Sequence, residues 1–123
     1  MKFREDLSQG AVVSKGLDKC LFLFTAEEWQ KWAKKIALSP TQADSRAFSR
    51  LMLSGAMDLE IDKQGRVVLP DYLRKYANLK KSVVIAGLYS RLEIWDEGGW
   101  EQYKQNTEKE SNEIAERLAQ LGI

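Results

Sequence analysis

Hydrophobic and polar residues alternate along two short stretches of the chain, residues 57–62 and 91–95. A period of two places the apolar side chains on one face, so each stretch is predicted to be a half-buried β-strand. After the first stretch, Gly65 supplies the positive φ of a tight turn, residues 67–69 form the predicted returning strand, and Pro70 ends it. The first stretch and its return are therefore predicted to form a β-hairpin.

Other segments carry apolar residues at helical spacing. Thr25 is the predicted N-cap of one helix, and Asp96 is the predicted N-cap of the last helix, whose apolar stripe runs through residues 100–121. A linking helix is predicted over residues 39–56, because residues 39–42 have the form of a capping box with a proline at the first helical position.

The chain contains one structural unit twice. When Trp29 is placed over Trp100, an offset of 71 residues, apolar residues and a glycine recur in the same order. The aligned residues are Val12, Val13, Gly16, Leu17, Leu21, Leu23 and Phe24, which fall on Val83, Val84, Gly87, Leu88, Leu92, Ile94 and Trp95. Each copy is predicted to hold a short helix (2–7 or 71–77), a strand (11–15 or 82–86), a Gly-Leu turn, a second strand (20–24 or 91–95) and a helix.

The second copy opens with the hairpin of residues 57–70, and we expect the first copy to lack its equivalent of about 15–20 residues. The predicted organisation is a first half over residues 1–38 without its opening hairpin, a linking helix over 39–56, a second half over 57–104, and a C-terminal helical extension over 105–123.

Composition excludes several classes of function. One cysteine and no histidine rule out a disulfide framework, a zinc site and a histidine-based catalytic triad. The sequence has no glycine-rich phosphate loop, and its paired carboxylates lack the apolar surroundings that acid–base catalysis needs. We therefore expect a protein that is not an enzyme and uses no metal, cofactor or small-molecule ligand. No apolar run is long enough to span a bilayer and no signal-peptide pattern is present, so we expect a cytoplasmic protein.

A formal net charge of +1 means that nucleic-acid binding would need positive charge gathered on one face or multiplied by oligomerisation. Lys63 and Arg66 project from the predicted hairpin tip, where Asp62 can accept turn N–H groups and pair with Arg66. Two cations held at a rigid hairpin tip suit contact with phosphate or with a guanine edge. A polar turn that is merely solvated fits the same spacing. Arg4 and Arg74 occupy matching positions in the two copies; we favour surface arginines or pseudo-symmetric packing arginines there, with DNA contact as the alternative.

The turn at residues 62–66, followed by Val-Val-Leu-Pro and Leu-Arg at 73–74, resembles the MraZ family of bacterial DNA-binding regulators. Residues 2–5, 16–21 and 48–56 carry the same resemblance, which is strong from residue 2 to about residue 100. It implies an α+β fold: a pseudo-two-fold, double-repeat β-barrel of the AbrB/MraZ swapped-hairpin type with flanking helices, here with the first hairpin missing.

The resemblance also implies a sequence-specific transcriptional regulator, usually a repressor, of the division and cell-wall gene cluster. Such a protein would act at the nucleoid, and a ring-like homo-oligomer would bind repeated promoter sites in double-stranded DNA through basic hairpin turns. Each half of the family carries an Asp-x-x-x-Arg turn, and here one is present, from Asp62 to Arg66. We therefore expect weaker DNA binding than with two turns. The alternative is an oligomeric, non-enzymatic scaffold whose DNA binding is impaired.

Overall fold

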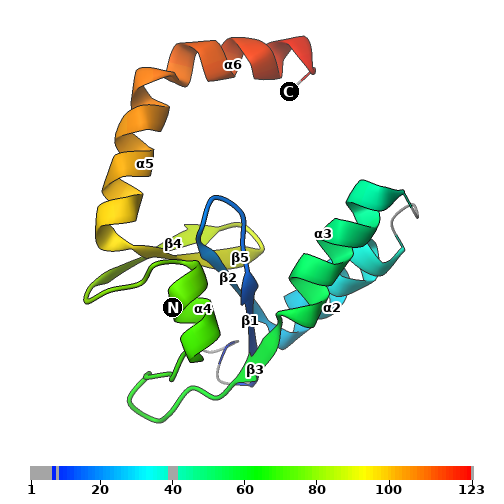
Figure 1. The fold of residues 1–123 in the computed structure, drawn as a ribbon, viewed down its shortest axis with the longest axis vertical. Helices are drawn as coiled ribbons and strands as arrows, with labels where there is room; N and C mark the ends of the chain where they lie inside the picture. Colours follow the sequence, from blue (N-terminus) through cyan, green and yellow to red (C-terminus); the bar gives the residue numbers. More distant parts are fainter. Residues whose placement is uncertain (1–6, 8, 39–41, 123) are drawn as a thin grey trace.

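A computed structural model describes residues 7, 9–38 and 42–122 (Figure 1). The described strands form one antiparallel five-stranded sheet in the order β3-β1-β2-β5-β4, and helices flank it. The elements in chain order are β1 (Ala11–Lys15), β2 (Leu21–Thr25), α2 (Ala26–Ala37), α3 (Ala43–Ser54), β3 (Met57–Leu59), α4 (Asp71–Tyr76), β4 (Val83–Leu88), β5 (Arg91–Asp96), α5 (Glu97–Lys109) and α6 (Ser111–Gln120). The fold is thus α+β. The swapped-hairpin barrel stays a prediction, because the described strands make one sheet that ends in β3 and β4.

The internal repeat appears as matching elements. β1, β2 and α2 correspond to β4, β5 and α5 at the offset of 71 residues, and the two long helices begin at equivalent N-caps. Thr25 Oγ1 accepts the Glu28 N–H at 3.1 Å, and Asp96 Oδ2 accepts the Gly99 N–H at 3.2 Å. Both N-caps were predicted, and both are confirmed.

The two copies meet where β2 pairs with β5. Phe22 lies opposite its own equivalent, Glu93, and on either side Leu21 faces Ile94 and Leu23 faces Leu92. At the offset of 71 residues, Ile94 is the equivalent of Leu23 and Leu92 is the equivalent of Leu21. The register is therefore the one that a two-fold axis between the copies requires. The seam joins the halves into a single sheet.

Both predicted Gly-Leu turns are wrong by about two residues. In the first copy the turn residues are Asp18 and Lys19, with φ of 59° and 60°, and the Gly16 N–H donates to the Cys20 carbonyl at 2.8 Å. Positive φ at both central residues matches the twist of the flanking strands. In the second copy β4 and β5 stay paired as far as Leu88 and Arg91, so Gly87 lies inside a strand. The turn falls at residues 89–90.

The predicted hairpin is wrong in its returning strand. β3 is three residues long and pairs with β1, and residues 60–70 form no strand. The two arms meet where the Asp62 N–H donates to the Arg66 carbonyl at 2.9 Å. Beyond that bond, apolar side chains of both arms pack against the buried core: Ile61, Val67 and Leu69. Side-chain packing therefore takes the place of the ladder that the sequence pattern predicted.

Helix boundaries also differ from the predictions. The linking helix, α3, begins at Ala43 with Gln42 as its N-cap, and residues 39–41 lie outside the described part of the chain. The predicted last helix is two helices, α5 and α6, separated at Glu110. The predicted helix over residues 2–7 lies outside the described residues except for Leu7, which is helical and buried.

Buried side chains form two clusters, one on each face of the sheet, because neighbouring strand residues point to opposite faces. One cluster includes Val13, Leu21 and Ile94 and is covered by Leu73 of α4. The other is largely aromatic and lies under α2 and α3: Cys20, Phe22, Phe24, Ile36, Met52 and Trp95. Both clusters draw residues from both copies, so the copies share their core.

Candidate nucleic-acid interface

The Asp62 carboxylate organises the turn after β3. Its Oδ1 accepts the backbone N–H groups of Gln64 at 2.9 Å and Arg66 at 2.8 Å, and its Oδ2 accepts the Nε–H of Arg66 at 3.0 Å. The Gly65 N–H donates to the Asp62 carbonyl at 3.0 Å. Gly65 has a φ of 82°, in the left-handed region that favours glycine. Asp62 and Gly65 thus shape the loop that carries the two basic residues.

These bonds hold the pKa of Asp62 below its ordinary value of 3.8. The Arg66 backbone N–H is the largest cause, and the Arg66 side chain and the Gln64 N–H add to it. A lowered pKa means that the ionised carboxylate stabilises the turn throughout the neutral range. That contribution is lost only as the pH falls through the lowered pKa.

The basic groups of the turn are open to solvent. Lys63 is exposed, and the Arg66 side chain is 73% exposed although its Nε–H is bonded to Asp62. That bond uses one of the five N–H donors of a guanidinium. The exposed remainder can reach a phosphate oxygen or the edge of a guanine. The carboxylate therefore fixes the direction of Arg66 while leaving its outer donors open.

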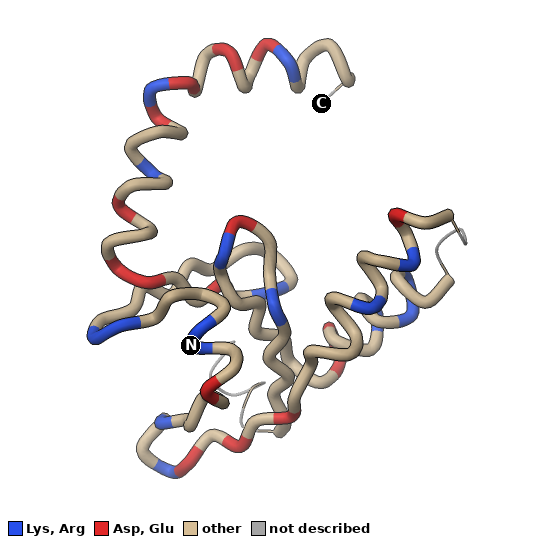
Figure 2. Tube along the Cα trace, in the orientation of Figure 1, with Lys and Arg blue, Asp and Glu red and all other residues tan. Residues whose placement is uncertain are grey.

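The loop carries acidic residues along its β3 arm and basic residues at its tip. Figure 2 shows acidic and basic positions next to one another along it. Asp58 and Glu60 lie on its β3 arm and are exposed, whereas Lys63 and Arg66 lie at its tip. Since the arm is acidic, contact with a polyanion is favourable only at the tip. The charge pattern thus confines any DNA contact to a small part of the loop.

The structure describes only one of the two arginines at matching positions in the copies. Arg74 lies on α4, where its Nη2 is 3.4 Å from Asp71 Oδ1 and its side chain is 54% exposed. Lys75 Nζ contacts the other oxygen of Asp71 at 3.0 Å. Arg74 is thus engaged within its own helix. Arg4 lies outside the described residues, so DNA contact by either arginine stays a prediction.

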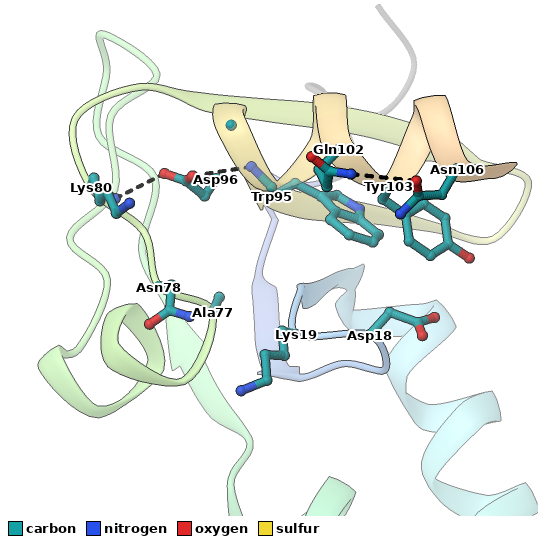
Figure 3. A pocket seen from close by; sticks show the side chains of 12 residues that line it. Asp18, Lys19, Ala77, Asn78, Lys80, Trp95, Asp96, Gln102, Tyr103 and Asn106 are labelled. Atoms are coloured by element: carbon teal, nitrogen blue, oxygen red, sulfur yellow. Dashed lines mark hydrogen bonds between the residues drawn. The ribbon is translucent and has the colours of Figure 1, made fainter. Parts of the chain in front are cut away.

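Sequence reasoning did not find a cavity beside α4 and α5, because its walls come from four separate segments. A cavity of about 540 Å³ lies between the turn after β1, the end of α4, the end of β5 and the start of α5 (Figure 3). Its polar groups bond to one another: Asp96 accepts the Lys80 N–H at 3.2 Å, and Gln102 donates to Asn106 at 3.3 Å. It shares no lining residue with the Asp62–Arg66 turn. The cavity therefore adds nothing to the interface.

Membrane-spanning helices and metal-binding clusters are both absent from the described residues. No helix in the described ranges is both long enough and apolar enough to cross a membrane. In the same part of the chain, no three acidic or cysteine side chains come together in a way that could hold a metal ion.

Comparison with known proteins gives consistent matches. A family model described as "MraZ protein, putative antitoxin-like" matches the chain twice, over residues 1–51 and 52–122. Similar proteins named transcriptional regulator MraZ include those of Thermoanaerobacter sp. (strain X514), 46% identical, Acetivibrio thermocellus, 45% identical, and Caldanaerobacter subterraneus subsp. tengcongensis, 43% identical. Each comparison covers 99% of this chain and 86% of the relative. Two consecutive matches to one model agree with the internal repeat.

Proposed function

This chain belongs to the MraZ family, and from that premise we propose that it regulates transcription by binding promoter DNA through the turn at Asp62–Arg66. The relatives named above are transcriptional regulators by name. The observation that carries the proposal is the exposed Arg66 guanidinium, held by a carboxylate that also accepts the turn's own N–H groups. A fixed cation loses less conformational entropy on contact than a free one does.

The mode of binding follows from the charge of the chain. A net charge of +1 provides little general attraction for a polyanion, so we propose that several copies act together in a ring-like homo-oligomer. Each copy then presents Lys63 and Arg66 to one of several repeated sites in the promoter. We propose that these sites lie upstream of the division and cell-wall gene cluster. Bound there, at the nucleoid, the protein acts as a repressor. The division of the chain into halves at residues 1–38 and 57–104 belongs to the same proposal.

Fluorescence anisotropy with the gene's own upstream DNA, across a salt series, tests the proposal. We expect salt-dependent binding by the wild-type chain and a loss of about ten-fold or more in affinity for Arg66→Ala, with a shallower salt slope. Arg50→Ala is the matched control, since it removes an equal charge from an exposed position on α3. We expect it to bind nearly as the wild type does.

Equal affinity for the Arg66→Ala and Arg50→Ala variants would remove the role that we give to the turn. Oligomers with no salt-dependent DNA binding at all would favour the alternative, a scaffold without DNA function. The two outcomes are distinguishable because the second also applies to the wild-type chain.

A further inference from the structure

The cavity beside α4 and α5 lies where the two copies of the repeat meet. Its volume of about 540 Å³ is in the range of sites that take small molecules. The turn of the first copy, Asp18–Lys19, forms one wall, and α5 of the second copy forms the facing wall (Figure 3). A ligand bound between these walls contacts both copies at once.

The α5 wall carries an aromatic surface. The ring centres of Trp95 and Tyr103 are 4.9 Å apart, and the Trp95 indole N–H donates to Glu93 Oε1 at 3.2 Å, which fixes the indole. Trp95 is almost fully buried, whereas Tyr103 is 41% exposed. Figure 3 shows both rings on the side of α5 that faces the cavity. Tyr103, packed against a fixed indole, therefore offers an exposed ring on which a flat ligand can stack.

Two amide side chains lie beside these rings on α5. Gln102 Nε2 donates to Asn106 Oδ1 at 3.3 Å. This bond leaves the Gln102 oxygen as an acceptor and the Asn106 amino group as a donor, and neither makes a further hydrogen bond within the described residues. Exchanging oxygen and nitrogen in both amides leaves the same combination. A neighbouring donor and acceptor complement the edge of a nucleobase, which carries the same two kinds of group side by side.

The opposite wall supplies a carboxylate. Asp18 is exposed, its φ of 59° is set by the β1–β2 turn, and its side chain makes no hydrogen bond within the described residues. A carboxylate is the group that binds ribose hydroxyls in dinucleotide-binding folds. The charged lining residues balance one another: Asp18, Asp96, Lys19 and Lys80. The cavity therefore suits an uncharged ligand that has hydroxyl groups.

A glycine at the start of α5 keeps the cavity open. Gly99 lies in the first turn of the helix, where glycine is a poor helix former, and its φ is outside the left-handed region. A Cβ at this position would meet Asp96 at 3.8 Å, which is an ordinary contact. Neither the backbone nor the packing thus requires glycine. Gly99 lines the cavity, however, so a larger side chain there would take up its space.

We propose that this cavity binds a nucleoside. The base stacks on Tyr103 and bonds to the Gln102–Asn106 pair, while a ribose hydroxyl donates to Asp18. This goes beyond the proposed function, because the cavity shares no lining residue with the Asp62–Arg66 turn. Composition predicted no small-molecule ligand, since residues from four segments make a site only after the chain has folded.

Isothermal titration calorimetry of the full chain with adenosine, guanosine, cytidine and uridine tests the site. We expect saturable binding of at least one nucleoside, one per chain, and much weaker binding of ribose alone. Gly99→Leu fills space in the cavity without removing a contact, so we expect it to abolish binding. Gln105→Leu is the matched control: it adds the same side chain at an exposed position of α5 outside the cavity, and we expect wild-type affinity.

Two substitutions of Tyr103 test the stacking. Tyr103→Ala should weaken binding about ten-fold because the base loses its platform, whereas Tyr103→Phe keeps a ring and should bind nearly as the wild type does. Far-UV circular dichroism checks that each variant is folded. No saturable binding by any of the four nucleosides, equal binding of ribose, binding that survives Gly99→Leu, or equal affinity of the two Tyr103 variants would each overturn the inference. These readouts use no DNA, so they are independent of the Arg66→Ala result.

Discussion

Asp62 places a negative charge in a loop that we propose contacts DNA, and its bonds give the physical reason. A carboxylate beside a phosphate is unfavourable by charge alone. Asp62, however, accepts two backbone N–H groups and the Nε–H of Arg66, and so keeps the loop in one conformation. At Asp62, the ordering of the loop therefore favours DNA binding, whereas the negative charge opposes it. The two effects predict opposite outcomes when the carboxylate is removed.

We expect Asp62→Ala to weaken DNA binding by about ten-fold, because the turn and Arg66 lose their anchor. Asp58→Ala is the matched control: it removes an equal charge from the exposed β3 arm of the same loop, and we expect equal or slightly tighter binding. Fluorescence anisotropy at fixed salt measures both. Tighter binding by both variants would show that Asp62 acts only through its charge.

Cys20 illustrates a side chain whose chemistry is set by burial. Its side chain is fully buried, and its Sγ–H donates to the Leu17 carbonyl at 3.1 Å. Burial first, and the nearby carboxylates of Glu93 and Asp18 next, raise the pKa of the thiol from 9.0 to about 12. The thiolate that reacts with electrophiles is therefore scarce in the folded protein.

From this pKa we expect slow labelling of Cys20 by a disulfide reagent at pH 8 and rapid labelling in urea. The folded thiol keeps its proton to higher pH than the unfolded one, so the free energy of unfolding falls as the pH rises from about 9 toward 12. Cys20→Ser keeps a donor for Leu17 and does not titrate in this range, so it should lose less stability over the same interval. Rapid labelling of the native chain at pH 8 would contradict the assignment.

At the scale of elements, sequence patterns were reliable where one local cause decides the structure. Thr25 and Asp96 were predicted as N-caps because a short polar side chain before a helix satisfies a free N–H group, and both do so. The strand of residues 11–15 was predicted correctly because its apolar run lies in the sheet interior.

Predictions failed where distant residues decide the structure. Residues 67–69 are apolar and two of them are β-branched valines, which is typical of a strand, yet Val67 and Leu69 use their side chains to pack on the core. The turn at Asp18–Lys19 depends on where β1 and β2 stop pairing, which no local pattern specifies. The Asp62–Arg66 turn was predictable, since five consecutive residues make it. The cavity beside α4 and α5 was not, because its walls come together only once four separate segments have packed.

At the scale of the whole molecule the two copies are interleaved. One buried cluster contains Leu21 and Val13 of the first copy with Leu73 and Ile94 of the second. The other contains Phe22 and Met52 together with Trp95. The β2–β5 seam continues this sharing through backbone pairing. Neither copy therefore keeps a complete core when the other unfolds, although the repeat in the sequence suggests two independent units.

Interleaving predicts that the chain unfolds in one transition. Leu21 is fully buried at the seam, so Leu21→Ala should lower the free energy of unfolding by about 2–5 kcal/mol. Because the core is shared, the urea midpoints from far-UV circular dichroism and from tryptophan fluorescence should fall together. Val68→Ala, at a position that is 87% exposed, should leave both nearly unchanged. All samples need the same protein concentration, since association adds to apparent stability. Two separate transitions, only one of them shifted by Leu21→Ala, would mean that each copy folds on its own core and that the seam is only a contact between finished halves.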